Sequence, residues 1–346
     1  MTAPAPIVWF VVPEGFDDPD RVSGGNVYDR RVGAELSGLG WDVRTVAAGI
    51  PVVTATTNPF ERIPDGALVL VDGLVAVEAP AALEGAAGRL RVVVLVHMAA
   101  GAFADADPLR IEGERRTLPL AGRVIVASEW LRDELEDRGL STPERLVVAT
   151  PGSDEAAPAA GTPTGGSILC VGVVAPHKGQ DTLIDALAAL GPDPSWTCTF
   201  AGSVEADHGF AARVAACADQ AGLSARITWA GVLNALELDD AYSRADVLIA
   251  PSRTESYGIA VGDALRRGIP VIASRVGGIA ESAHPEDAAI LVPPQDPRAL
   301  GEALRQWIED PALRARMSAA ARRAAPIRKR WSDTARTIDF TLRGMP

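Results

Sequence analysis

Short runs of apolar, mostly β-branched residues alternate with longer amphipathic stretches along nearly the whole chain, and this alternation limits the possible folds more than any other feature. In the first half the candidate strands are Ile7–Val12, Val43–Val46, Leu68–Val71, Arg91–Val96, Val124–Ala127 and Leu146–Ala149. In the second half they are Ser167–Gly172, Thr197–Ala201, Arg226–Trp229, Val247–Ala250, Val271–Ala273 and Ile290–Val292. Most are continuous apolar runs, which is typical of parallel strands covered by helices on both faces. The pattern predicts an α/β fold built from βαβ units.

The two series of strands are separated by a segment without periodicity, APAAGTPTGG at residues 157–166, whose composition is typical of a linker. A chain of 346 residues has room for about two domains. We therefore predict two doubly wound, Rossmann-like domains that face each other across a cleft.

Overall charge limits the class of partner. The formal net charge of −12 disfavours nucleic acid and acidic lipid surfaces, both of which recruit basic patches. An anionic ligand must then be met by local positive charge. No apolar run approaches the ~20 residues that a membrane span needs, and the first residues lack the basic region of a signal peptide. We expect a cytoplasmic protein.

Cysteine and histidine spacing argues against a disulfide framework or a metal site. The three cysteines are odd in number and have no CxxC spacing, and the four histidines form no HExxH motif or close pair. We expect reduced thiols in the core and no transition-metal site built by the protein.

Two features of the first half lie where ligands bind in open α/β sheets, beyond the carboxyl ends of strands. After the first strand, Ser23-Gly24-Gly25 opens a helix, and paired glycines let backbone N–H groups approach a phosphate. Strand Arg91–Val96 ends at His97, which can donate a hydrogen bond to an anionic oxygen or a sugar hydroxyl. The alternatives are a plain turn at the glycines and a structural role for the histidine.

In the second half, strand Ser167–Gly172 leads into a turn that carries Lys178 and Gly179 before the next helix. The chain has only two lysines, Lys178 and Lys329, so an ammonium at a helix start is a candidate partner for a diphosphate. The alternative is a solvated surface lysine.

Strand Val247–Ala250 is followed by a loop and helix that contain the sequence ESYGIAVGD. Glu255 lies in the loop, Ser256 is a candidate helix cap, Gly258 is near the first turn, and Asp263 is about one and a half turns into the helix. A carboxylate in this position can accept hydrogen bonds from ligand hydroxyls, and the second acid can bind the diol of a ribose. The alternative is a capping acid and a solvated one.

Residues 251–281, PSRTESYGIAVGDALRRGIPVIASRVGGIAE, resemble the signature region of retaining, nucleotide-sugar-dependent glycosyltransferases of family 4, which have the GT-B fold. Other landmarks of that family are matched in order by Ser23-Gly24-Gly25, Pro151-Gly152, Val171-Gly172, Lys178-Gly179, residues 227–231 and Ala245-Asp246-Val247. The resemblance covers nearly the whole chain. It implies an acceptor domain at residues 1–158, a nucleotide-sugar domain at 166–325, and a segment at 326–346 that crosses back onto the first domain.

The resemblance also implies roles for particular residues. Glu255 would hold hydroxyls of the donor sugar, Asp263 the ribose and Lys178 the diphosphate, and His97 would contact the sugar from the acceptor side. The remaining donor-binding positions are Gly24, Gly25, Gly172, Arg253, Ser256, Tyr257 and Gly258. Tyr257 and Gly258 would offer backbone N–H groups, and the catalytic set would be His97, Lys178 and Glu255.

Two positions depart from the family pattern. Asp263 stands where a glutamate is expected and is one methylene shorter. Val173 and Val174 follow Gly172 where the family often has an arginine, and Arg253 is a candidate replacement for that cation, with a surface role as the alternative. A DxD sequence ending at Asp107 matches the metal motif of the other large glycosyltransferase fold, but we interpret it as a solvated turn.

The predicted reaction is transfer of a hexose-type sugar from a UDP- or GDP-linked donor to an acceptor hydroxyl. The resemblance implies retention of configuration, a same-face mechanism and no metal or other cofactor. The acceptor would be a small molecule or a glycoconjugate. The alternatives are a sugar-nucleotide epimerase of the same fold and a non-catalytic nucleotide-binding protein.

Overall fold

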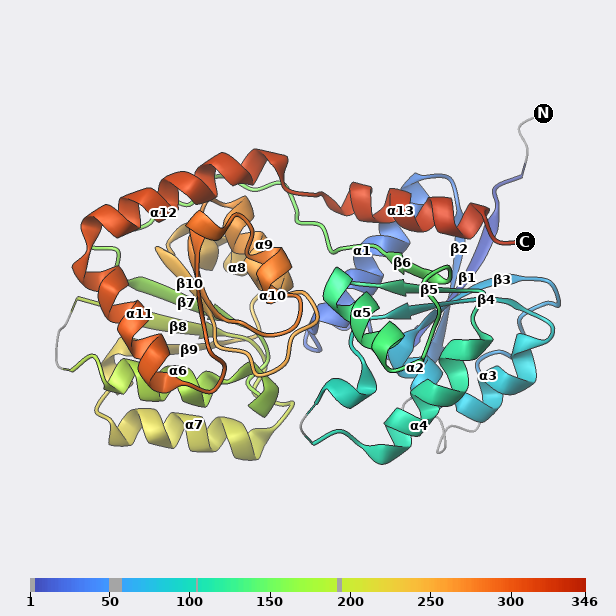
Figure 1. Cartoon of the computed structure of the whole chain (residues 1–346), viewed down its shortest axis with the longest axis horizontal. Coiled ribbons are helices and arrows are strands. Elements are labelled where there is room, and N and C mark those ends of the chain that lie inside the picture. The colour runs from blue at the N-terminus through green and yellow to red at the C-terminus, as the bar shows by residue number, and fades with distance from the viewer. Residues whose placement is uncertain (1–3, 50–57, 104, 192–194) are drawn as a thin grey trace. The chain divides into compact units, whose positions relative to one another are not determined.

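The structure is a computed structural model that describes residues 4–49, 58–103, 105–191 and 195–346. The chain forms two compact units, one made of residues 1–152 with 330–346 and the other of residues 153–329. Figure 1 labels the strands and helices of each.

The first unit is built on a six-stranded sheet in which every pairing is parallel, in the order β2-β1-β3-β4-β5-β6. Its strands are β1 (Ile7–Pro13), β2 (Asp42–Ala48), β3 (Leu68–Asp72), β4 (Arg91–Val96), β5 (Arg123–Val126) and β6 (Leu146–Val148). Residues of β3 and β4 are buried on both sides, which explains why these strands are continuous apolar runs.

The helices of the first unit begin at recognisable sequence signals. They are α1 (Gly24–Gly38), α2 (Gly73–Glu78), α3 (Pro80–Ala87), α4 (Pro108–Thr117), α5 (Glu129–Asp137) and α13 (Trp331–Arg343). Ser23, Asp72, Asp107 and Ser128 each cap the helix that follows them through a side-chain oxygen. Asp107 belongs to the DxD sequence, and its carboxylate accepts a hydrogen bond from Leu109 N at 2.8 Å. The DxD is an exposed turn that starts a helix, as predicted.

The last helix completes the first unit, although it lies far away in the sequence. In Figure 1 α13 lies beside α1. The Trp331 ring packs edge-on against Tyr28 with ring centroids 5.5 Å apart, and Thr334 Oγ1 donates to Thr150 O at 2.7 Å. At the other end of the helix, Trp41 Nε1 donates to Asp339 at 2.7 Å.

The second unit contains another parallel six-stranded sheet, in the order β12-β11-β10-β7-β8-β9. Its strands are β7 (Ser167–Val171), β8 (Thr197–Ala201), β9 (Ile227–Gly231), β10 (Val247–Ala250), β11 (Val271–Ser274) and β12 (Ala289–Val292). Its helices are α6 (Gln180–Ala188), α7 (His208–Gln220), α8 (Ala235–Ser243), α9 (Ile259–Arg266), α10 (Ile279–Ser282), α11 (Pro297–Glu309) and α12 (Pro311–Ala324).

The core of the second unit has two layers, one on each face of the sheet. Along β7, Ile168 and Cys170 join a cluster with α6, α7 and α11, whereas Leu169 joins the opposite cluster with α8, α9 and α10. This alternation is the two-residue period of a strand buried on both faces. Cys170 and Cys198 are buried free thiols, as predicted, but Cys217 is exposed.

All twelve predicted strands are present, with ends that shift by one or two residues. The segment predicted as a linker has no helix or strand, yet it packs on the second unit. Ala159 N donates to Arg267 O at 2.8 Å, and Thr162 N and Oγ1 both donate to Asp246. These contacts make the stretch part of the second unit.

Strand order locates the ligand-binding edge of each sheet. In the first unit the chain runs from β1 to β2 and then returns to the other side of β1 with β3. In the second unit it runs from β7 through β8 to β9 and then returns to the other side of β7 with β10. Each such reversal leaves a crevice at the carboxyl ends of the two central strands, where ligands of doubly wound folds bind.

Candidate functional site

The loops after β7 and β10 meet at the strand-order reversal of the second unit. The loop after β7 contains a single 3₁₀ turn, Pro176–Lys178, and Gly179 caps α6 with a φ of +69°. A Cβ on Gly179 would lie 2.1 Å from Pro251 O in the loop after β10. Glycine is needed here for both reasons, and it lets the two loops pack backbone against backbone.

This packing brings Lys178 and Glu255 together. Lys178 Nζ lies 2.5 Å from Glu255 Oε2, and the two side chains are 24% and 15% exposed. Arg253 N also donates to His177 O at 2.7 Å and joins the two loops a second time. Two residues that sequence analysis selected independently thus form one ion pair at the expected edge of the sheet.

Arg253 lies beside this pair, but its guanidinium has partners of its own. One Nη atom is 2.6 Å from Asp181 Oδ2, and the other donates to Pro176 O. These contacts brace the 3₁₀ turn that carries Lys178. This bracing contact is neither the diphosphate contact nor the surface role that the sequence left open for Arg253, and the diphosphate contact stays a prediction.

The start of α9 differs from the prediction. We expected Ser256 to cap this helix, but Gly258 is the N-cap, with a φ of +92° and no side-chain hydrogen bond. A Cβ there would lie 2.7 Å from Ile279 Cδ1, so Gly258 is required by space as well as by conformation. The prediction was wrong because an α-helix can start on a left-handed glycine without a capping oxygen.

Asp263 is the fifth residue of α9 and is half-buried. Its charge acts on Tyr242, Tyr257 and Arg328. Burial, opposed by Arg328, raises the pKa of Tyr257 above its ordinary value. The structure therefore places Asp263 in a group with an arginine and two tyrosines, and it pairs Glu255 with Lys178.

In the first unit, the diglycine lies directly against His97. Ser23 Oγ accepts from Asn26 N at 3.1 Å and starts α1, which makes Gly24 and Gly25 its first residues. A Cβ on Gly25 would lie 3.1 Å from His97 Cδ2. The glycines are therefore the beginning of a helix packed on the histidine and not an isolated turn.

His97 itself lies between two buried carboxylates. Its Nε2 is 2.8 Å from Asp29 Oδ1 and 3.2 Å from Asp72 Oδ2. Asp72 uses its other oxygen to cap α2, at Leu74 N and Val75 N. Asp29 comes from the buried face of α1. Sequence analysis missed both acids.

A signal for each acid is present in the sequence. Asp72 directly follows the apolar run LVLV and precedes a helix, which is the position of a capping acid at a strand end. Asp29 falls in the apolar stripe of α1 between Gly25 and Val32, where a carboxylate is out of place unless it has a buried partner.

The environment of this cluster changes its protonation. Burial is the main reason that the pKa of Asp29 rises to about 7. Burial opposes a charge on His97, but the charge of Asp29 and the hydrogen bonds that His97 donates to both acids raise the pKa of His97 to about 10. Asp29, Asp72 and His97 are also the one group in the described part of the chain whose ligand atoms are close enough to hold a metal ion.

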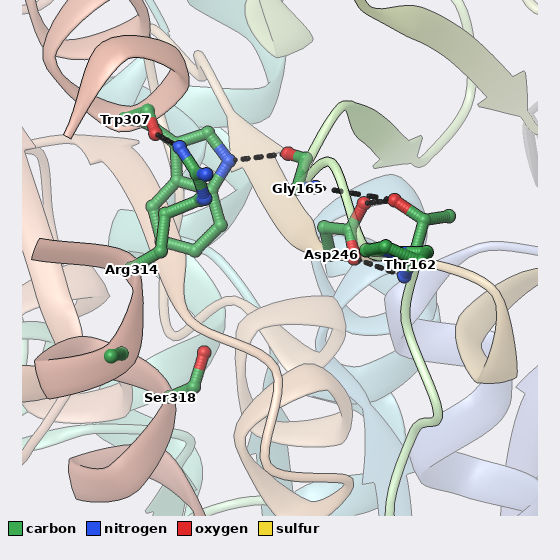
Figure 2. A pocket seen from close by; sticks show the side chains of 8 residues that line it. Thr162, Gly165, Asp246, Trp307, Arg314 and Ser318 are labelled. Atoms are coloured by element: carbon green, nitrogen blue, oxygen red, sulfur yellow. Dashed lines mark hydrogen bonds between the residues drawn. The ribbon is translucent and has the colours of Figure 1, made fainter. Parts of the chain in front are cut away.

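A cavity of about 200 Å³ lies at the other end of the strands of the second sheet, where the strands begin (Figure 2). Asp246, just before β10, accepts hydrogen bonds from Thr162 and from Ser167 N at the start of β7. Trp307 Nε1 donates to Gly165 O, and Arg314 donates to Trp307 O. Because these groups satisfy one another at the amino ends of the strands, we interpret the cavity as part of the scaffold.

Comparison with known proteins assigns a family to the second unit. Residues 158–324, most of the second unit, match the family model described as glycosyl transferases group 1. The match covers just under half of the chain. The group 1 match contains both loops that bear Lys178 and Glu255.

Related proteins agree with this assignment. The chain is 31% identical over 242 residues to a D-inositol 3-phosphate glycosyltransferase of Kineococcus radiotolerans. The matched region covers 62% of this chain and 56% of that protein. The chain thus spans little more than half the length of these curated relatives.

Solved structures show the fold of the chain. Sucrose-phosphate synthase from Thermosynechococcus elongatus superposes with a TM-score of 0.82 at 22% identity and covers 98% of both chains. Anabaena HepE in complex with UDP-glucose gives a TM-score of 0.75 at 17% identity, over 97% of this chain and 99% of that one. The predicted GT-B fold is confirmed. No helix in the described residues has the length and apolar character needed to cross a bilayer.

Proposed function

We propose that this chain transfers a hexose-type sugar from a UDP- or GDP-linked donor to the hydroxyl of a small molecule or glycoconjugate, with retention of configuration and without a metal. The observation that carries the proposal is the Lys178–Glu255 pair, joined at 2.5 Å between the loops that follow β7 and β10. A cation beside a carboxylate at this edge suits a ligand that combines a diphosphate with hydroxyl groups.

In the proposed reaction, the bond between the sugar C1 and the diphosphate oxygen breaks, and a bond from C1 to the acceptor oxygen forms on the same face. The acceptor proton passes to the departing diphosphate. Lys178 offsets the negative charge that develops on this leaving group, and Glu255 orients the sugar through its hydroxyls. Asp263 is proposed to bind the ribose, and Tyr257 and Gly258 to offer backbone N–H groups.

In the first unit, His97 is proposed to donate a hydrogen bond to the sugar, and Gly24 and Gly25 to offer N–H groups at the start of α1. The donor site is proposed to include Gly172 and Arg253, the latter through its support of the turn before Lys178. The cytoplasmic location stays a prediction, which the three free cysteines support.

The proposal is tested with purified protein, a panel of UDP- and GDP-sugars and a panel of acceptors that includes inositol phosphates. We expect release of one nucleoside diphosphate for each sugar transferred, in the presence of a chelator. An altered nucleotide sugar formed without acceptor would establish the epimerase instead. Tight nucleotide binding without turnover under any acceptor would establish the non-catalytic protein.

A further inference from the structure

The histidine of the proposed site is held by an arrangement that the family match does not explain, because Asp29 and Asp72 lie in the first unit, outside residues 158–324. Both acids contact the same ring nitrogen of His97, Nε2, at 2.8 and 3.2 Å. One nitrogen thus serves two carboxylates, each from a different element.

Asp29 has no other evident purpose. Its side chain is 1% exposed, and its second oxygen, Oδ2, has no hydrogen-bond partner in the described part of the chain. Burying a carboxylate costs several kcal/mol unless a charge compensates it. Its neighbours on the buried face of α1 are Tyr28, Val32 and Leu36, so packing alone would favour an apolar residue here. A positive charge on His97 is the compensation that the structure offers.

The other nitrogen of His97 is left for a ligand. Within the described residues, the ring contacts both acids through Nε2, and the side chain is 19% exposed. When both ring nitrogens carry protons, Nδ1–H is a second donor. The Nε2 bonds fix the ring, so Nδ1–H has a defined direction.

Other charged or titratable groups near this ring do not determine the charge of His97. Tyr28 lies edge-on to His97 at 5.1 Å, but its hydroxyl donates to Ala149 O, and burial raises its pKa, so it stays neutral. On α4, Glu114 accepts from Ala100 N and lies 3.4 Å from Arg138, so its charge is already matched. The two aspartates are the groups that act on His97 directly.

We propose that Asp29 and Asp72 are positioning residues that keep His97 as an imidazolium and aim its Nδ1–H at an oxygen of the donor sugar or its phosphate. The identity of the ligand rests on the proposed function, whereas the charged state of His97 does not. A permanently charged donor stabilises negative charge at the leaving group better than a neutral imidazole does.

The charged state is tested by following the imidazole NMR signals of the full chain from pH 5 to 10. The chain has four histidines, and Asp29→Asn, Asp72→Asn and His97→Gln variants identify and perturb the relevant one. We expect His97 to remain protonated above pH 8 and to lose its proton at least one pH unit earlier in each aspartate variant. Asp107→Asn, which changes a helix cap elsewhere in the same unit, should shift nothing.

Two results would overturn the proposal. One is a His97 that titrates near pH 6.5 in the unaltered chain or is insensitive to both aspartate variants. The other is one equivalent of Zn²⁺ or Mn²⁺ bound per chain and lost in all three variants, which would make the cluster a metal centre. Should Asp29→Asn fail to fold, Asp29→Leu suits the apolar face of α1 and serves the same purpose.

A second readout separates this inference from the proposed function. With an active donor and acceptor, Asp29→Asn and Asp72→Asn should lower kcat at least tenfold at pH 8, and less at pH 6, while nucleotide affinity is unchanged. A uniform loss at every pH would indicate a merely structural role and contradict the proposal. If no donor is turned over, the NMR titration still decides the state of His97.

Discussion

Single residues in this protein hold charge in two different settings. Lys178 and Glu255 form a partly exposed pair that a ligand can reach, whereas Asp29 and Asp72 enclose His97 with little access to water. In the first setting the partners can separate and bind other groups. In the second they mainly determine each other's protonation.

The first prediction at this scale is a pH dependence of stability. The pKa of His97 is raised to about 10 from an ordinary 6.5, so its stabilising contribution is complete below about pH 6.5 and is lost as pH rises through 10. Burial raises the pKa of Asp29 from its ordinary 3.8 to about 7. The stabilising contribution of this group is therefore also lost as the pH rises, but at lower pH than that of His97. The double variant Asp29→Asn with His97→Gln should lack this loss.

Urea unfolding at pH 6, 8 and 9.5 measures this loss of stability. The free energy of unfolding of the unaltered chain should fall by about 1–3 kcal/mol more than that of the double variant over this range. Parallel curves for the two proteins would show that the cluster does not titrate as described.

The second prediction concerns the Lys178–Glu255 pair. Lys178→Ala should weaken UDP or GDP binding about tenfold or more, because a charge-assisted contact to the diphosphate is lost. Glu255→Gln should leave this affinity equal or tighter, since it frees the ammonium, and should lower turnover about a hundredfold. Calorimetric titration and initial rates measure the two effects.

The chain supplies its own control for this test. Its other lysine, Lys329, can be changed to alanine with the same loss of charge. If Lys329→Ala reduces nucleotide affinity as much as Lys178→Ala, the effect comes from net charge and not from a site.

At the scale of elements, close backbone packing joins loops that carry functional residues. Gly179 and Pro251 join the loops after β7 and β10, and Gly25 allows α1 to start against His97. Sequence analysis placed Gly25, His97, Lys178 and Glu255 near strand ends because the two-residue period and its interruptions are visible in the sequence. These are positions where a βαβ pattern alone is informative.

Other features of the site depend on contacts that no local pattern records. Asp29 and Asp72 are 43 positions apart and meet only because β1 and β3 are neighbours. The cap of α9 falls on Gly258 and not on Ser256 because Ile279 closes the space around it. Tertiary packing decided both, so propensity could not predict them.

The third prediction tests the contact between loops. Gly179→Ala would place a Cβ 2.1 Å from Pro251 O and force a residue with φ +69° into a strained conformation. We expect at least about 2–3 kcal/mol of destabilisation and a weaker nucleotide affinity.

Gly191→Ala is the matched control, because its φ is +78° and no atom lies within 4 Å of the added Cβ. It should cost only about 1 kcal/mol and leave binding unchanged. Equal effects of the two variants in urea unfolding would mean that backbone strain alone, and not the packing of the loops, explains the loss.

At the scale of the whole molecule, the two sheets share one architecture but differ in how the chain builds them. The second unit is one continuous segment, residues 153–329. The first unit needs both ends of the chain, because α13 covers α1 through Trp331, Ala335 and Ile338, all of them buried.

The fourth prediction is that Trp331→Ala destabilises the first unit by about 3–5 kcal/mol, although it lies at the far end of the sequence. Phe340 is the control, since it lies on the same helix and is 83% exposed. Phe340→Ala should change stability by less than about 0.5 kcal/mol. Urea unfolding combined with hydrogen exchange of β1 and β3 shows which unit is affected, and a loss confined to the second unit would contradict the prediction.

The dependence of the first unit on α13 has a consequence for synthesis. A ribosome makes residues 1–152 first, but the helix that covers α1 is translated only after the whole second unit. The later, continuous unit can therefore finish folding while the earlier one still exposes the apolar side of α1. The first unit must therefore stay incomplete until α13 has been made.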